Sequence, residues 1–110
     1  NIDDRHQDMA NIANQAARRL GLDTELSATD FDNDDTFVGA GYGLPSPEGL
    51  NALRTLARTE GILLDPVYTS KALAGLFAHV VDGRLDGEAI FLHTGGSPAL
   101  FAYAQDVLAE

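Results

Sequence analysis

Apolar residues recur at helical spacing in four stretches of the chain, and each stretch is bounded by residues that start or stop helices. Ser46-Pro47-Glu48, for example, combines an N-cap hydroxyl, a first-turn proline and an acid near the positive end of the helix dipole. The predicted helices run over residues 4–20, from residue 47 to Gly61, from the turn at Lys71 to Gly83, and from Ser97 to about Leu108.

Two short apolar runs lie between the later helices. Ile62-Leu63-Leu64 and Ala89-Ile90-Phe91-Leu92 are too short for helices and suit buried strands. Strands that alternate with helices imply parallel pairing through right-handed crossovers, so the sequence predicts an α/β fold. Because two strands do not make a sheet that stands alone, and because the chain begins at Asn1, we expect a piece of a larger α/β protein.

A polar turn follows each predicted strand, at residues 65–71 and 93–98. Parallel neighbours would bring both turns to one sheet edge, where open α/β folds bind ligands. We therefore expect Tyr68, Thr69, Thr94 and the amides of Gly95 and Gly96 to converge. Two helix N-termini would then favour an anionic or electron-rich ligand. A plain strand-to-helix turn is the alternative interpretation of the glycine pair.

Composition narrows the class of protein. The chain has 110 residues, enough for one small domain, and its 7 basic against 17 acidic residues give a net charge of −10. This balance argues against a nucleic-acid partner, which needs clustered Lys and Arg. The absence of cysteine excludes a disulfide framework, and no apolar run approaches a membrane span, so we expect no membrane partner and a cytoplasmic protein.

Other chemistries fit the sequence poorly. The acidic loop over residues 22–41 contains Asp30, Asp32 and Asp34 at calcium-loop spacing, but Asp35 and Gly41 stand where an EF-hand needs Gly and Glu. The three histidines show no metal-ligand spacing, so no metal is expected. No G-x-S-x-G elbow is present, which argues against a hydrolytic triad.

A long ordered block from residue 39 to residue 104 resembles one enzyme family, whereas residues 1–38 match it only loosely. The chain is similar here to D-cysteine desulfhydrase and its relatives L-cysteate sulfo-lyase and 1-aminocyclopropane-1-carboxylate deaminase. The matching motifs are Gly41-Tyr42-Gly43-Leu44-Pro45, Glu48-Gly49, Leu56-Ala57-Arg58-Thr59-Glu60-Gly61-Ile62-Leu63-Leu64-Asp65-Pro66-Val67-Tyr68-Thr69, Lys71-Ala72 and His93-Thr94-Gly95-Gly96-Ser97-Pro98-Ala99-Leu100-Phe101-Ala102-Tyr103.

The resemblance implies a fold, a cofactor and a catalytic pair. These relatives are pyridoxal-phosphate enzymes of the tryptophan-synthase-β-like fold type II. Residues 1–110 would then form a single segment, the C-terminal part of the large cofactor-binding domain, with a three-layer partial parallel sheet and flanking helices. Tyr42 and Tyr68 would flank the substrate, with Tyr68 as the catalytic phenol.

The resemblance also implies the cofactor contacts. Thr94 would hydrogen-bond the pyridine nitrogen, Thr69 would lie beside it, and Gly95 and Gly96 would pack under the ring. The deaminase branch typically carries Glu and Leu where this chain has Thr69 and Thr94. A neutral hydroxyl at the ring nitrogen makes a weaker electron sink, which suits β-elimination. The sequence therefore leans toward a desulfhydrase or sulfo-lyase.

Parts of the family's machinery have no match in this chain. The Schiff-base lysine, the phosphate-binding loop and a serine near the substrate carboxylate lie earlier in such enzymes, and Lys71 occupies a different family position. We expect this chain alone to be inactive and the intact enzyme, a homodimer, to convert D-cysteine to pyruvate, ammonia and hydrogen sulfide. The alternatives are L-cysteate sulfo-lyase, a deaminase of the 1-aminocyclopropane-1-carboxylate type and a non-catalytic α/β fragment that binds an anion.

Overall fold

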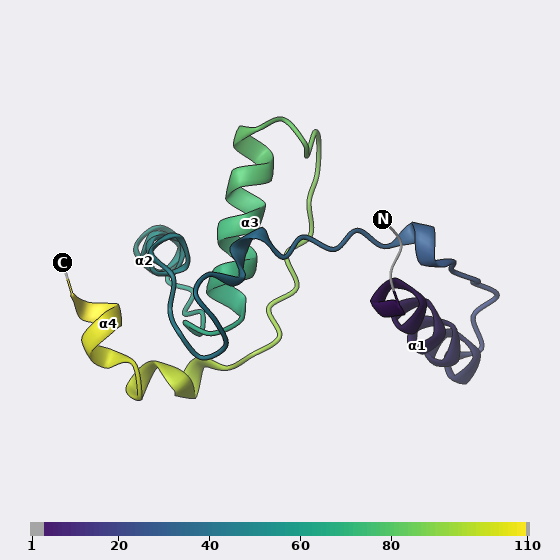
Figure 1. Ribbon diagram of the computed structural model, residues 1–110, viewed down its shortest axis with the longest axis horizontal. Coiled ribbons are helices and arrows are strands. Elements are labelled where there is room, and N and C mark those ends of the chain that lie inside the picture. Colours follow the sequence, from purple (N-terminus) through teal and green to yellow (C-terminus); the bar gives the residue numbers. More distant parts are fainter. Residues whose placement is uncertain (1–3, 110) are drawn as a thin grey trace. The chain divides into compact units, whose positions relative to one another are not determined.

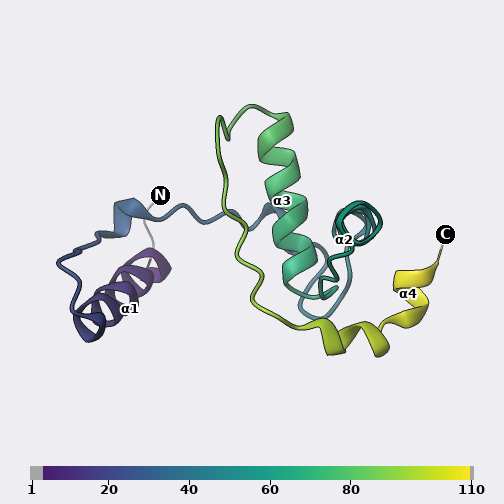
Figure 2. The same cartoon turned by 180° about the vertical axis from the view of Figure 1, so that it is seen from behind.

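The computed structural model describes residues 4–109 and divides the chain into two compact units. The boundary in the sequence falls between Asp34 and Asp35. Figures 1 and 2 show the helices of each unit in two opposite views. Within residues 4–109, no helix is both long enough and apolar enough to cross a membrane.

The first unit is built on helix α1 (Asp4–Leu20), which has the predicted bounds. The 3₁₀ helix η1 (Ala28–Asp30) follows and contacts α1. Asn14 fixes this return, because its side-chain amide donates to the carbonyl of Leu26 and accepts from the Leu26 amide, both at 2.8 Å. Asp30 accepts from the Ser27 amide at 2.7 Å, and this hydrogen bond and one from the Ser27 hydroxyl lower the pKa of its carboxyl. Asp30 therefore closes a local turn.

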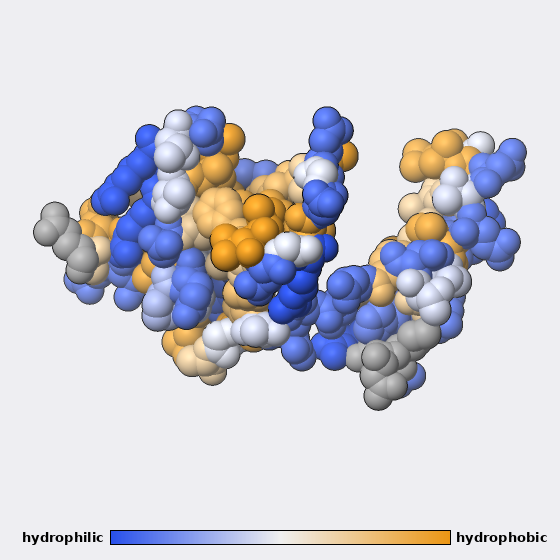
Figure 3. All heavy atoms as spheres, turned by 90° about the horizontal axis from the view of Figure 1, so that it is seen from above, coloured by the Kyte–Doolittle hydropathy of each residue, from blue (hydrophilic) through white to orange (hydrophobic). Residues whose placement is uncertain are grey.

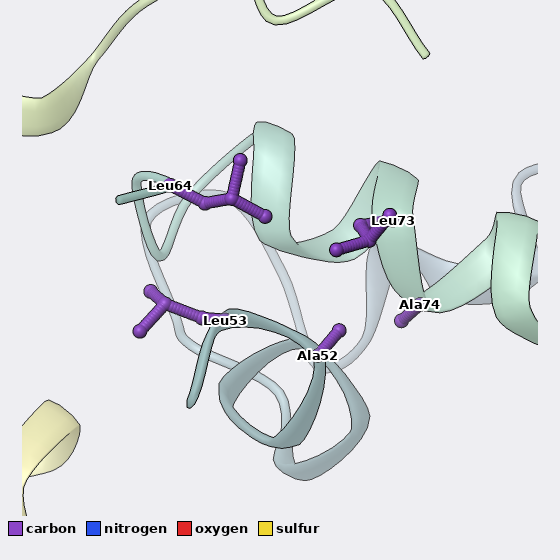
Figure 4. Packing of buried hydrophobic residues seen from close by; sticks show 5 residues of the cluster. All are labelled: Ala52, Leu53, Leu64, Leu73 and Ala74. Carbon is purple, nitrogen blue, oxygen red and sulfur yellow. The ribbon is translucent and has the colours of Figure 1, made fainter. Parts of the chain in front are cut away.

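The second unit has its core between helices α2 (Pro47–Glu60) and α3 (Thr69–Val81), with the 3₁₀ helix η2 (Thr36–Val38) packed against α3. The ends of α2 follow the sequence signals: the Ser46 hydroxyl accepts from the Gly49 amide at 3.1 Å, and Gly61 ends the helix at a φ of 68°. Figure 4 shows apolar side chains of both helices, with one from the intervening segment, that face each other; they are Ala52, Leu53, Leu64, Leu73 and Ala74.

The two predicted strands are not strands in this structure. Residues 62–64 and 89–92 have no regular secondary structure, and no strand occurs within residues 4–109, so the predicted parallel sheet is not confirmed. A strand forms only when a neighbour accepts and donates its ladder hydrogen bonds, and neither segment pairs with the other. Leu64 and Phe91 still pack at the core, whereas Ile90 is 97% exposed and Leu92 is 77% exposed. Figure 3 shows hydrophobic residues at the surface in orange, among hydrophilic residues in blue.

The last predicted helix is also wrong in its continuity. In place of one helix over residues 97–108, the structure has a 3₁₀ helix, η3 (Ser97–Phe101), and a short helix, α4 (Ala104–Leu108). The backbone leaves helical geometry at Tyr103, whose phenol donates to the carbonyl of Gly43 at 2.8 Å. Arg54 of α2 donates to the carbonyls of Asp106, Val107 and Ala109 and so binds the end of α4. Contacts with distant segments at both ends of α4 thus accompany the break, and helical spacing alone gives no sign of them.

Candidate active site

The turn before α3 is organised by the carboxylate of Asp65, a side chain that is only 1% exposed. Its Oδ2 accepts from the amides of Val67 and Tyr68, each at 2.8 Å. Its Oδ1 accepts from the amide of Thr69 at 2.8 Å and from the Thr69 hydroxyl at 2.7 Å. These amides stand at the start of α3, where a helix leaves donors without partners. Asp65 therefore caps α3 from just outside the helix.

The charge state of Asp65 follows from these contacts. Burial acts to raise its pKa, but the hydrogen bonds from Thr69, Tyr68 and Val67 outweigh burial and hold the pKa below the ordinary 3.8. The carboxylate is therefore ionised at neutral pH and lies at the positive end of the α3 dipole. The chain's own carboxylate occupies the amides of Val67, Tyr68 and Thr69, and an anionic or electron-rich ligand at the two helix N-termini stays a prediction.

Thr69, expected beside the cofactor, lies within the same turn. Its side chain is buried, and its hydroxyl both donates to the Asp65 carboxylate and accepts from the Asp65 amide at 2.9 Å. These two hydrogen bonds leave the hydroxyl oxygen with one further lone pair. The structure thus gives Thr69 a role in fixing Asp65, and its contact with a cofactor stays a prediction.

Tyr42 and Tyr68 lie together. Their phenolic oxygens are 2.5 Å apart in a hydrogen bond, and the ring centroids are 5.8 Å apart with the rings inclined at 62°. Tyr42 comes from the loop before α2 and Tyr68 from the N-cap of α3, and both are exposed, at 81% and 57%. The hydrogen bond with Tyr42 raises the pKa of Tyr68 above the ordinary 10.0, so Tyr68 is a neutral phenol at pH 7.

The loop that carries Tyr42 is held by residues to which the sequence reading gave no such role. The Lys71 ammonium donates to the carbonyls of Val38 at 2.6 Å and Gly41 at 3.2 Å. The Tyr103 phenol holds the same loop at Gly43. The Lys71 side chain is buried, with only 7% exposed. The Asp65 cap could have been predicted from the sequence, because an aspartate stands four residues before Thr69, where α3 begins. No sequence pattern indicates the contacts of Lys71 and Tyr103 with the loop.

The second turn is anchored through His93. Its Nδ1 accepts from the Gly95 amide at 3.0 Å, so Nε2 carries the hydrogen and donates to the carbonyl of Leu63 at 2.9 Å. The Ser97 hydroxyl donates to the same carbonyl at 3.3 Å. These bonds tie residues 93–97 to the segment that leads into Asp65.

The two turns lie side by side, as the sequence predicts. Gly96 lies so close to Asp65 that a Cβ built on it would stand 2.9 Å from the Cβ and Cγ of Asp65. Gly95 has open space beside it, with nothing within 4 Å of an added Cβ. Thr94 is exposed, and within residues 4–109 its hydroxyl has no hydrogen bond. The structure thus places Thr94 and the glycine pair beside the Asp65 turn, without a hydrogen bond between Thr94 and either phenol.

Comparison with known proteins identifies the family. The model of the family described as "Pyridoxal-phosphate dependent enzyme" matches residues 2–95. The chain belongs to this family. A solved structure described as an ACC deaminase homologue is 34% identical to the chain and superposes with a TM-score of 0.71. The match covers 89% of this chain and 29% of that one, so this chain spans less than a third of the length of the ACC deaminase homologue.

The residues present fit one end of this cofactor. The unpaired hydroxyl of Thr94 suits the nitrogen of a pyridine ring, and the open space at Gly95 leaves room for a flat ring. The phenols of Tyr42 and Tyr68 are exposed. Lys71, the only lysine, is buried and bound to two carbonyls, and is therefore a poor candidate for the lysine that holds the cofactor covalently.

Proposed function

We propose that this chain is the C-terminal part of the large domain of a pyridoxal-phosphate-dependent lyase that carries out β-elimination on D-cysteine. The products of the intact enzyme are pyruvate, ammonia and hydrogen sulfide. The observation that carries the proposal is the exposed Tyr42–Tyr68 phenol pair beside a turn that holds an unpaired threonine hydroxyl and an open glycine. The residues of the motifs that resemble D-cysteine desulfhydrase include this pair and this turn.

The chain's own residues divide the work as follows. The cofactor, when bound, supplies an electron sink for the substrate α-carbon. Tyr68, a neutral phenol at pH 7, donates a hydrogen bond or a proton from its Oη to the reacting substrate. Tyr42 supports that oxygen through the shared hydrogen bond. Thr94 would hold the ring nitrogen of the cofactor with a neutral hydroxyl, and the weaker electron sink that results would favour loss of the sulfur leaving group at the β-carbon.

Tyr68→Phe tests this role in the intact enzyme. Removal of the phenolic oxygen should lower kcat by about 100-fold or more, the range typical of a lost general acid or base, while the visible absorption band of the bound cofactor persists. Phe101→Tyr, which adds a phenol at an exposed site on η3, serves as the matched control and should keep its turnover. Normal turnover by a Tyr68→Phe enzyme with full cofactor content would contradict the catalytic assignment.

Substrate comparison tests the reaction. The intact enzyme should release sulfide and pyruvate from D-cysteine faster than sulfite from L-cysteate or ammonia from 1-aminocyclopropane-1-carboxylate. A preference for L-cysteate would make it a sulfo-lyase, whose sulfonate needs an extra cation. Arg54 does not offer one, because its guanidinium is bound to the end of α4. A preference for 1-aminocyclopropane-1-carboxylate would agree with the similarity to the ACC deaminase homologue and would overturn the sulfur-amino-acid assignment.

The proposal also covers the isolated chain and its setting. With Lys71 held by two carbonyls, the 110-residue chain mixed with pyridoxal phosphate and D-cysteine should form no sustained pyruvate. Sustained pyruvate and sulfide from that mixture would refute this part of the proposal. A cytoplasmic homodimer that acts on a small amino acid completes it, and a monomer mass for the intact enzyme in solution would contradict the dimer.

A further inference from the structure

Lys71 links the helix that carries Tyr68 to the loop that carries Tyr42. It lies in the first turn of α3, three residues after Tyr68, and its side chain is buried. The stem passes Gly49 at the start of α2, where an added Cβ would stand 3.4 Å from the Lys71 Cγ. The ammonium ends at the carbonyls of Val38 and Gly41. A single side chain thus runs from the helix that carries Tyr68 to the loop that carries Tyr42.

The loop has little structure of its own to fix Tyr42. Residues 39–46 have no regular secondary structure, and glycine occupies positions 39, 41 and 43. Glycine-rich segments lose much conformational freedom on ordering, so their conformation depends on contacts from outside. Charge-assisted hydrogen bonds from an ammonium are stronger than neutral ones, especially where water is excluded. Lys71 provides two such bonds on the side of Tyr42 that precedes it in the chain.

A second hold acts on the other side of Tyr42. The Tyr103 phenol donates to the carbonyl of Gly43 at 2.8 Å, so Tyr42 stands between a carbonyl bound by Lys71 and a carbonyl bound by Tyr103. An added Cβ at Gly43 would lie 3.6 Å from the Tyr103 oxygen. The residues on both sides of Tyr42 are therefore fixed, while its own ring stays exposed.

We propose that Lys71 is a positioning residue that holds the loop of residues 38–43 against α3 and thereby sets Tyr42 in hydrogen-bonding contact with Tyr68, with Tyr103 as the second hold. The catalytic consequence rests on the proposed function. The structural consequence does not, because it concerns only residues of this chain.

Lys71→Met tests the structural consequence in the full 110-residue chain, with neither cofactor nor substrate. Methionine keeps much of the apolar stem and removes the ammonium. We expect the nuclear Overhauser effects between the rings of Tyr42 and Tyr68 to disappear, while the methyl signals of Leu53 and Leu73 keep their folded positions. Arg58→Met, which removes one cation from an exposed site on α2, is the charge-matched control and should keep the ring contacts. Ring contacts that persist in a folded Lys71→Met chain would overturn the proposal.

Tyr103→Phe gives a second test if Lys71→Met does not fold. This variant removes one oxygen and one hydrogen bond, and we expect it to weaken the ring contacts without abolishing them. Unchanged contacts in Tyr103→Phe, together with an unfolded Lys71→Met, would assign Lys71 to general stability and refute positioning.

In the cofactor-bound enzyme, Lys71→Met should lower kcat by about tenfold or more with little change in KM or in the cofactor absorption band. If the enzyme has a different activity from the one proposed, the ring contacts still test the positioning role. Failure of the function and failure of the positioning are therefore separate results.

Discussion

At the scale of single residues, the site depends on two phenols that share one hydrogen bond in an exposed place. An exposed tyrosine ordinarily keeps a pKa near 10, but Tyr42 acts on the Tyr68 oxygen and raises its pKa. Tyr68 therefore retains its proton well above neutral pH. A group of this kind acts as a hydrogen-bond or proton donor more readily than as a base in the free protein.

Tyr42→Phe should bring the pKa of Tyr68 back toward 10.0, because the hydrogen bond with Tyr42 is the largest cause of its elevation. Ring ¹³C chemical shifts of labelled tyrosine, followed against pH, report each phenol separately in a chain with only 3 tyrosines. Phe101→Leu, at an exposed aromatic site, provides the comparison and should leave the Tyr68 titration unchanged. An unchanged Tyr68 pKa in Tyr42→Phe would show that the phenols do not share a hydrogen bond in solution.

At the scale of elements, α3 begins where Asp65 makes it begin. The carboxylate gathers the amides of Val67, Tyr68 and Thr69 and so fixes the direction in which the helix leaves the turn. Tyr68 and Lys71 both depend on this first turn. The Asp65 cap therefore helps to position the site, although within residues 4–109 Asp65 forms no hydrogen bond with the phenol of Tyr42 or Tyr68.

Asp65→Asn should reduce the free energy of unfolding by about 1–3 kcal/mol at pH 7, because an amide accepts with one oxygen and brings an unpaired donor into a buried site. The native pKa of Asp65 lies below its unfolded value of 3.8. The stability it contributes is thus fully present above 3.8 and is lost as the pH falls through the native pKa. Urea titrations followed by circular dichroism should show a gap between wild type and variant that narrows in acid. A gap of the same size at pH 7 and pH 2.5 would contradict this account.

The sequence predicted the helices whose first and last residues are determined by neighbouring residues in the chain. The N-cap at Ser46, the proline after it and Gly61 are residues that start or stop a helix wherever they occur, and α2 has these bounds. Residues 62–64 and 89–92 have strand composition, yet a strand also needs a hydrogen-bonding neighbour, which no local pattern supplies. The break at Tyr103 depends in the same way on Gly43, 60 positions earlier.

Only those residues of the candidate site that belong to family motifs could be predicted from the sequence. The resemblance paired Tyr42 with Tyr68, and the structure brings them together across 26 positions of sequence. The hydrogen bond from Lys71 to the carbonyl of Val38 spans 33 positions, and neither the residue types nor their spacing predicts it. The role of a lysine depends on whether its side chain is buried, and burial of a long polar side chain is set by tertiary packing.

At the scale of the whole molecule, an acidic surface coexists with exposed apolar side chains. The net charge is −10, while Ile90 and Leu92 project away from the core on either side of Phe91, which packs against it. Exposed apolar side chains that lie close together in the sequence favour association between copies of the chain, and the negative charge that all copies share opposes it. The balance between the two depends on ionic strength.

The isolated chain should therefore self-associate more at 1 M salt than at 0.05 M salt, because screening removes the repulsion and leaves the apolar contacts. Sedimentation velocity at both salt concentrations measures the change, and Ile90→Thr should reduce it. Leu20→Thr, at an exposed apolar site on α1, is the control and should leave the salt response intact. A chain that stays monomeric at high salt would show that these side chains are covered in solution.

The close approach of Gly96 to Asp65 also limits how this turn can evolve. The nearest atom to an added side chain at position 96 is the Asp65 Cβ, which every residue except glycine possesses. Replacing Asp65 therefore does not make room for a larger residue at position 96. An evolving gene could relax the constraint only by placing glycine at position 65, which would remove the carboxylate that caps α3, or by moving one backbone away from the other. As long as Asp65 caps α3, position 96 is thus closed to larger residues.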